Sequence, residues 1–278
     1  IIMVVQHNLT AMNANRQLGI VTNSQAKATE KLSSGYKINR AGDDAAGLSI
    51  SEKMRSQIRG LNKASTNAED GVSLIQTAEG ALNETHSILQ RMNELATQAA
   101  NDTNTSTDRK AIKAELTALT SELNRIASTT QFNTMNLLDG TFTGKNLQVG
   151  ALSGQKISIS ISGMNANKLG LAGKNGKMSI AVSTFTAAGK AMTKIQSAIT
   201  KVSTQRSALG AIQNRLEHTI ANLDTTSENT SSAESRIRDT DMADAMVEYS
   251  KNQILAQAGQ SMLAQANQAT QGVLSLLG

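Results

Sequence analysis

The side chains most able to do chemistry in this chain are three histidines and a few closely spaced carboxylates. His7, His86 and His218 lie far apart in the sequence, and none has the spacing of a metal-binding pair or of an H-E-x-x-H motif. On a helix, His86 and His218 fit a polar seam or a surface better than a metal site. The candidate acid groups, whose spacing is also usual on charged helix faces, are Glu84 with Glu94, and Asp239 with Asp241 and Asp244.

Composition and motifs exclude further classes of chemistry. The chain has no cysteine, which removes disulfides, thiolate–metal sites and thiol nucleophiles. No glycine-rich phosphate-binding motif follows a predicted strand, so nucleotide binding has no support. We therefore expect no enzyme, no cofactor and no metal.

The elements that position these side chains are predicted to be long helices. The chain of 278 residues has no proline and no tryptophan, and aromatic residues make up 2% of it. Because proline breaks helix interiors, its absence suits long uninterrupted helices, and the shortage of aromatic residues favours narrow helix–helix seams. The net charge of +5 is spread without a dense basic block, so we expect no nucleic-acid binding.

One heptad column predicts the longest helix, which Asp43 and Asp44 can cap and which continues to about Ala100. A helix of roughly 55 residues is about 80 Å long, far beyond an ordinary globular helix, and points to a coiled coil. The column has no polar interruption and consists of Leu61, Ala68, Ile75, Leu82, Leu89 and Ala96.

A second helix is expected to fold back antiparallel on the first. Thr105 and Asp108 have the spacing of a capping box, with Asp in place of the usual Glu or Gln. The apolar stripe that follows is Ile112, Leu116, Leu119, Leu123 and Ile126. Its helical signal ends in an Asn-rich loop that closes with Asp139-Gly140, a turn signal.

The middle of the chain changes period. Apolar and polar residues alternate at 147–149, 157–162 and 178–182, which predicts two or three short strands, with one hairpin, in an insert at about 140–185. Helix returns from about Thr186 to Asp224, on a column of Ile195, Val202, Leu209, Leu216 and Leu223. The Ser/Thr/Asn-rich Thr225–Ser232 predicts a break before the last helix.

The two ends of the chain are predicted to be amphipathic helices that pair with each other. Residues 252–278 carry no charge, yet their eight Asn and Gln side chains argue against membrane insertion. Residues 1–40 contain five basic groups and one acid, whereas residues 232–278 contain three bases and five acids. The N-terminus lacks the pattern of a signal peptide, so secretion would need another route. The apolar positions expected to form a polymerisation core are Leu9, Met12, Leu18, Leu255, Met262, Ala266, Val273 and Leu276.

Four segments carry a family resemblance. Residues 32–48, Leu-Ser-Ser-Gly-Tyr-Lys-Ile-Asn-Arg-Ala-Gly-Asp-Asp-Ala-Ala-Gly-Leu, resemble the N-terminal signature of bacterial flagellins, and residues 71–80 extend it. Ala233-Glu-Ser-Arg-Ile-Arg-Asp239 and Met262-Leu-Ala-Gln-Ala-Asn-Gln268 resemble the C-terminal signature. Residues 1 and 2 precede Met3, where the family start would lie, and Gln268-Ala-Thr-Gln271 lacks a proline common in the family.

The resemblance implies a fold and a domain organisation. It implies a mainly α protein, a long antiparallel helical coiled-coil rod with a small β-hairpin insert, whose termini pair as a helical core domain. That core would comprise residues 1–44 and 233–278 with linkers, and the rod domain would comprise residues 45–232, without outer variable domains. The linker positions are Asn39, Arg40, Gly42, Asp43, Asp44, Arg236 and Arg238.

The resemblance also implies a function and partners. These are self-assembly into the extracellular flagellar filament for motility, type III export with a chaperone at the C-terminal segment, and contacts with hook-associated and cap proteins. Recognition by Toll-like receptor 5 would use Gln90, Arg91, Glu94, Leu95 and Glu115, with Leu95 as an exposed apolar anchor beside Arg91. Asn93 stands where stimulatory relatives often carry a second Arg. The alternatives are a hook–filament junction protein and a coiled-coil secreted adhesin or effector.

Overall fold

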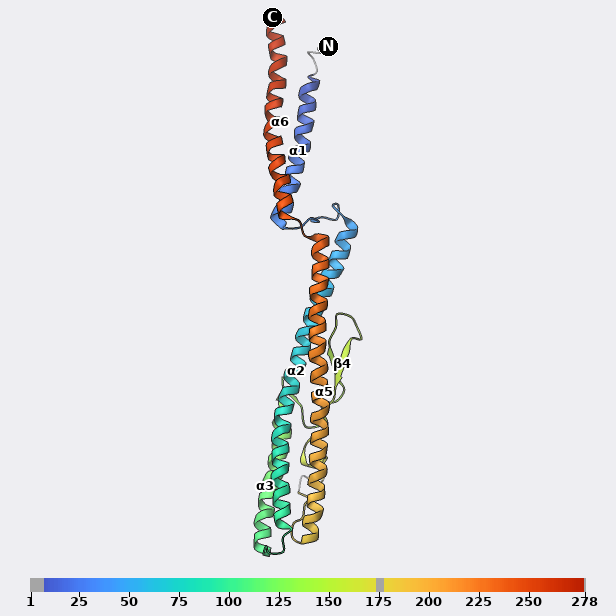
Figure 1. Ribbon diagram of the computed structural model, residues 1–278, viewed down its shortest axis with the longest axis vertical. Coiled ribbons are helices and arrows are strands. Elements are labelled where there is room, and N and C mark those ends of the chain that lie inside the picture. The colour runs from blue at the N-terminus through green and yellow to red at the C-terminus, as the bar shows by residue number, and fades with distance from the viewer. Residues whose placement is uncertain (1–7, 174–177, 278) are drawn as a thin grey trace. The chain divides into compact units, whose positions relative to one another are not determined.

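The computed structural model describes residues 8–173 and 178–277, with side chains up to residue 269 (Figure 1). The described chain is mainly helical, as predicted, and divides into two compact units. Unit 1 is Ile1–Ser56 with Asn229–Gly278, and unit 2 is Gln57–Glu228. The domain boundaries expected at 44/45 and 232/233 stay predictions. His7, and the side chains of Val273 and Leu276, lie outside the described residues.

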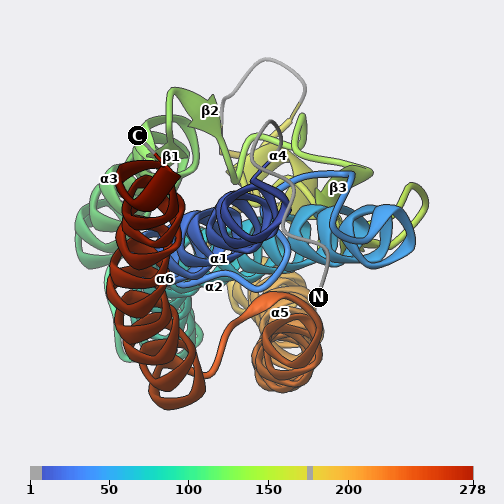
Figure 2. The same cartoon turned by 90° about the horizontal axis from the view of Figure 1, so that it is seen from above.

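Unit 1 contains an antiparallel pair of terminal helices, α1 (Leu9–Ser34) and α6 (Met242–Leu277). Figures 1 and 2 both place α1 beside α6. Gly259 permits a close approach, because a Cβ atom there would lie 3.3 Å from Leu18 Cδ1. Small residues at the seam therefore bring the two helix backbones together.

The two segments that join the terminal helices to the rest of unit 1 also pair. Gly35, with φ +74°, ends α1 in the left-handed conformation that glycine adopts readily. The backbone N–H of Lys37 donates to Arg238 O at 2.7 Å, and the N–H of Thr240 donates to Gly35 O at 3.0 Å. These bonds flank an antiparallel bridge between Tyr36 and Asp239.

Unit 2 is built on the paired helices α2 (Ala45–Ala99) and α5 (Phe185–Arg238), each of which also contributes to unit 1, together with α3 (Ser106–Thr129). All six residues of the predicted α2 column and all five of the α5 column are buried. On α3, Ile112, Leu116 and Leu123 are buried, and Leu119 and Ile126 pack against the same core. The heptad columns therefore predicted the seams correctly.

Apart from isolated bridges, the strands of the described residues form two small hairpins. β1 (Gln131–Phe132) pairs with β2 (Met135–Asn136) across a turn in which Asn133 and Thr134 have positive φ. β3 (Lys145–Gln148) pairs antiparallel with β4 (Lys156–Ile159), with Lys145 opposite Ile159. This second hairpin rests on α2, where Gly60 leaves room for Ala151, whose Cβ would be 2.9 Å from a Cβ at position 60. The short helix α4 (Ala166–Leu169) follows.

Two predictions about elements are wrong. Residues 178–182 form no strand beyond an isolated antiparallel bridge between Met178 and Ala172, although Ile180 and Val182 are buried and their neighbours are exposed. The predicted break at Thr225–Ser232 is absent, because α5 continues to Arg238. Thr225 Oγ1 donates to Ala221 O at 2.8 Å, and Ser227 Oγ donates to Asn62 Oδ1 of α2 at 2.6 Å. These hydroxyls find partners within the helix pair.

Candidate assembly and binding surfaces

Arg91 lies at the centre of an exposed charged cluster between α2 and α3. Its guanidinium donates to Glu115 Oε1 through Nη2 at 3.0 Å and Nε at 3.1 Å, and to Glu94 Oε2 through Nη1 at 3.1 Å. The hydrogen bonds that Arg91 donates to Glu115, and then the one to Glu94, raise the pKa of Arg91. The structure thus brings together three of the five residues predicted for receptor binding.

The other two predicted receptor residues lie elsewhere on α2. Leu95 is only 2% exposed and belongs to the core, so the expectation of an exposed apolar anchor is wrong. The reason is that Leu95 lies in the core cluster that α2 shares with residues of α3 and α5. Gln90 is exposed, and its Nε2 lies 3.0 Å from His86 Nε2.

The predicted linker residues divide into a loop and a helix end. Asp43 Oδ2 accepts the backbone N–H groups of Arg40 at 3.0 Å and Asn39 at 3.2 Å, which lowers the pKa of Asp43. Asp44 Oδ1 accepts the N–H of Gly47 at 2.9 Å and so caps α2, as predicted.

Arg236 and Arg238 were expected in a linker but lie in the last turn of α5. The Arg238 guanidinium stacks over the Tyr36 ring at 4.5 Å from its centroid. A cation at a helix C-terminus also interacts favourably with the helix dipole, so both side chains stabilise the end of α5. Gly42 is the remaining position predicted for the linker, and it lies in the loop before α2.

The described members of the predicted polymerisation core are exposed or half-buried in unit 1. Leu9, Met12 and Met262 are 63%, 64% and 61% exposed. Leu255 is also exposed, whereas Leu18 and Ala266 are half-buried along the α1–α6 seam. The seam itself buries Ala28, Ala245 and Ala256. Each terminal helix therefore has one apolar face against its partner and further apolar side chains facing outward.

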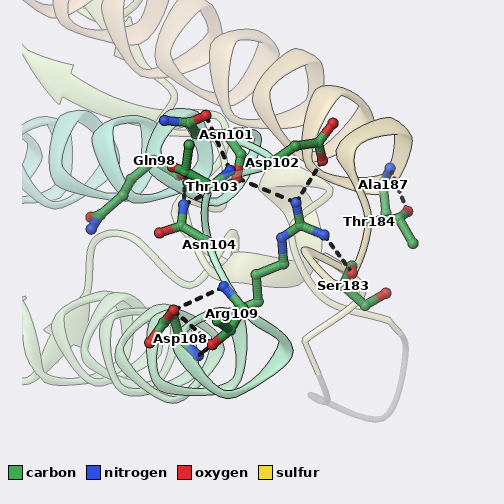
Figure 3. A network of polar contacts seen from close by, with 11 residues as sticks. Gln98, Asn101, Asp102, Thr103, Asn104, Asp108, Arg109, Ser183, Thr184 and Ala187 are labelled. Atoms are coloured by element: carbon green, nitrogen blue, oxygen red, sulfur yellow. Dashed lines mark hydrogen bonds and ion pairs between the residues drawn. The ribbon is translucent and has the colours of Figure 1, made fainter.

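A polar network that the sequence did not reveal ties the α2–α3 turn to the segment before α5 (Figure 3). Arg109 Nη2 donates to Asp102 Oδ1 at 2.9 Å and Asn101 O at 3.3 Å, and Nη1 donates to Ser183 O at 3.2 Å. The predicted capping box is present, since Thr105 Oγ1 accepts the N–H of Asp108 and the Asp108 carboxylate accepts the N–H of Thr105. Only the capping box had a sequence signal.

None of these surfaces resembles a catalytic centre. Among residues 8–173 and 178–277, no three His, Cys, Asp or Glu side chains are arranged to hold a metal ion. Within the same residues, no helix is long and apolar enough to cross a membrane. The paired long helices, buried heptad seams and outward apolar side chains define a structural, helical assembly protein.

The chain belongs to the bacterial flagellin family. The model of the bacterial flagellin N-terminal helical region matches residues 5–143, and that of the C-terminal helical region matches residues 192–277. Members of this family are structural flagellar proteins, which confirms the prediction that the chain is not an enzyme.

Individual relatives agree with this assignment. The chain is 55% identical to a flagellin from Halalkalibacterium halodurans and 50% identical to the flagellar filament 31.3 kDa core protein of Treponema maltophilum. Both alignments cover 99% of this chain and 100% of the relative. The crystal structure of Bacillus cereus flagellin matches with a TM-score of 0.50 and 31% identity, over 57% of this chain and 88% of that one. A putative flagellar hook-associated protein from Vibrio parahaemolyticus shares only the fold, at 13% identity and a TM-score of 0.59 over 71% of this chain and all of that one.

Proposed function

We propose that this chain assembles with copies of itself into the extracellular flagellar filament and thereby serves cell motility. The observation that carries the proposal is the set of outward-facing apolar side chains in unit 1, in a chain that matches flagellar filament core proteins along their whole length. The alternative function, that of a hook–filament junction protein, is supported only by the fold that the chain shares with the putative hook-associated protein.

The exposed apolar residues of unit 1 support assembly energetically. Val247, Ile254 and Met262 of α6 are each more than 60% exposed, at 69%, 66% and 61%. Burying such a side chain contributes about 1.5–3 kcal/mol, and large exposed apolar patches mark interaction sites. Neighbouring copies that cover these side chains would stabilise the terminal helices, which as an isolated pair bury little apolar surface.

Hydrogen exchange on the monomer and on the filament tests the proposal. We expect amides of α1 and α6 to exchange rapidly in the monomer and slowly in the filament, with α2 and α5 protected in both. Met262→Gln should slow elongation from seeds, whereas Gln257→Asn, an exposed amide on the same helix, serves as the control. A monomer in which α1 and α6 are already fully protected would contradict the proposal.

Export and the accessory partners form a further part of the proposal. The family implies secretion through the flagellar export channel, a chaperone at the C-terminal segment, and hook-associated and cap proteins at the filament ends. The unassembled chain should bind such a chaperone through α6, and the same chain in filaments should not bind it. Binding that is equal in both states would argue against a role before assembly.

Recognition by Toll-like receptor 5 is proposed at the Arg91 cluster. Gln90, Arg91, Glu94 and Glu115 offer an exposed, hydrogen-bonded charged surface, and Leu95 contributes from the core beneath it. Arg91→Ala should lower receptor signalling in a reporter-cell assay. Arg125→Ala is the matched control, since Arg125 forms a comparable exposed ion pair with Glu122 at 2.6 Å on α3. Equal signalling by both variants would remove the Arg91 cluster from the receptor site.

A further inference from the structure

A hollow in unit 2 is lined by the turn of the β3–β4 hairpin and by the helices α2 and α5. We call it the hairpin hollow, and its volume of about 440 Å³ is within the range of small-molecule sites in proteins. Gly60 lets the turn lie against α2, since a Cβ atom there would come within 2.9 Å of Ala151 Cβ. Buried Val149, Ile157 and Leu223 give the hollow apolar walls. Neither the proposed assembly surface of unit 1 nor the proposed receptor surface includes these residues.

Two cationic residues line the hairpin hollow. Lys156 comes from β4 and Arg215 from α5. No Asp or Glu is among the described residues that line the hollow. Within the same part of the chain, neither cation takes part in an ion pair or donates a side-chain hydrogen bond. The hollow therefore carries two positive charges that the described residues do not neutralise.

Two acidic side chains of the same stretch of α5 bond elsewhere. Glu217 Oε1 accepts a hydrogen bond from Gln213 Nε2 at 2.9 Å, and Asp224 Oδ1 accepts one from Ser65 Oγ of α2 at 2.9 Å. Neither carboxylate lines the hollow. A cleft that holds one sign of charge between low-dielectric walls focuses the electric field and concentrates counter-ions. The arrangement of charge at this site therefore favours a bound anion.

The donor groups of the hollow fit the oxygens of a phosphate. A guanidinium such as that of Arg215 presents a planar fork of N–H groups that matches two phosphate oxygens, and the Lys156 ammonium adds a compact point charge. Gly150 is buried among the lining residues, and its backbone N–H has no acceptor among the residues that the structure describes. Gln57 and Asn222 contribute exposed amide groups. Two unpaired cations match the charge of a dianion better than that of a single carboxylate.

We propose that the hairpin hollow binds a small oxyanion of the phosphate class, held by Arg215 of α5 and Lys156 of β4. The hairpin is already tied to α2, because Asn67 Nδ2 donates to Gln148 O at 3.1 Å. The bound anion ties it to α5 as well, since its oxygens accept hydrogen bonds from both elements. The site lies within one chain and is independent of the proposed filament function.

Calorimetric titration of the unassembled chain with inorganic phosphate, in chloride at constant ionic strength, tests the proposal. We expect saturable binding of one phosphate per chain. Arg215→Gln and Lys156→Gln should each weaken binding by at least about tenfold, because each removes a charge-assisted hydrogen bond. Lys145→Gln removes the same charge from an exposed position of the same hairpin outside the hollow and should bind like the unmodified chain. An unmodified chain without saturable binding, or equal binding by all four chains, would overturn the proposal.

Competition and hydrogen exchange give two further readouts. Sulfate should displace phosphate, whereas acetate at the same concentration should not, and displacement by acetate would overturn the assignment to the phosphate class. Glycerol 3-phosphate that binds more tightly than inorganic phosphate would identify a phosphorylated small molecule as the ligand, and equal affinity would identify the free anion. Phosphate should also slow hydrogen exchange in the hairpin turn of the unmodified chain but not of Arg215→Gln. Melting without phosphate verifies that each variant folds, and equal slowing in both chains would contradict a tie through Arg215.

Discussion

Asn8 holds both terminal helices at once. Its Oδ1 accepts the N–H of Ala11 and caps α1, while its Nδ2 donates to the carbonyl oxygen of Ala266 on α6 at 3.0 Å. The N-cap residue of the first helix thus also bonds to Ala266 of the last helix, 258 positions away in the sequence. Pairing of α1 with α6 is in this way linked to the formation of α1 itself.

Asn8→Ala should therefore weaken both helices. Loss of an N-cap costs about 1 kcal/mol, and loss of the bond to Ala266 removes a tie between the ends. We expect faster hydrogen exchange at the start of α1 and near Ala266 in assembled filaments. Asn13→Ala, which changes an exposed asparagine whose Oδ1 accepts from Arg16 Nη2 at 3.1 Å, is the control. Unchanged exchange near Ala266 would show that the side chain serves α1 alone.

Asn252 is a buried polar residue in the seam of unit 1, 7% exposed, with no partner for its Nδ2 among the described residues. Buried asparagines in helix seams reduce stability and favour one register. Asn252→Leu should increase protection of α6 amides in the monomer. Gln253→Leu places the same side chain on an exposed position and should leave exchange unchanged. Lower protection in Asn252→Leu would contradict this expectation.

Leu82 is fully buried in the longest heptad column of α2. Leu82→Asp should lower the free energy of unfolding by about 4 kcal/mol or more, because it removes apolar contacts and buries a charge. Thermal unfolding followed by circular dichroism measures the loss. Asn83→Asp, at the exposed neighbouring position, should melt like the unmodified chain. An unchanged melting temperature for Leu82→Asp would mean that the column faces solvent.

Arg109 joins three backbone segments through a side chain that is only 14% exposed. Arg109→Met should destabilise unit 2 by about 1–3 kcal/mol, since the partners Asp102, Asn101 O and Ser183 O lose their donor. The faster exchange should be confined to the α2–α3 turn and to the segment before α5. Lys110→Met, on the next and exposed position, is the control. Exchange that rises uniformly along unit 2 would contradict a local clamp.

Acid should weaken the start of α3 through Asp108. Hydrogen bonds from the Thr105 side chain and then from its backbone N–H lower the pKa of Asp108 below its ordinary value of 3.8. The folded-state pKa is the lower one, so the stabilisation is present above about pH 4 and is lost as the pH falls through the depressed pKa. Asp108→Asn should flatten this acid dependence of melting, and Asp70→Asn, an exposed carboxyl on α2, should not. Identical acid profiles for all three chains would exclude Asp108 as a contributor.

Much of this fold follows from the sequence because its helices bury single heptad columns. Leu61 to Ala96 and Ile195 to Leu223 could be predicted as seams, since each side chain repeats at the spacing that faces one neighbour. The alternation of apolar and polar residues at 178–182 predicts a strand. Such alternation indicates only an extended chain with one buried side, whether or not a second strand pairs with it. Ile180 and Val182 are buried against the core without a ladder.

The surfaces were harder to predict than the seams. Leu95 was expected outside because the family resemblance assigns it to a receptor site, whereas the folded chain buries it in the core shared by α2, α3 and α5. A run of Ser, Thr and Asn such as Thr225–Ser232 predicts a loop because these side chains often bond to nearby backbone outside helices. In the folded chain the Thr225 hydroxyl bonds to a carbonyl one turn earlier in the helix, and the Ser227 hydroxyl bonds to Asn62 on another helix. Arg109 gave no signal at all, because its three acceptors come together only in the folded chain.

The bridge between Tyr36 and Asp239 has a mechanical consequence. Two chain segments, rather than one, connect the terminal helices to the rest of unit 1, and the bonds Lys37 N–H to Arg238 O and Thr240 N–H to Gly35 O fasten them side by side. A pull on the terminal helices is shared between both segments, and neither can stretch without shearing the bonds to the other. Such a doubled tether transmits torque and tension with little slack, where a single flexible linker would twist and extend first.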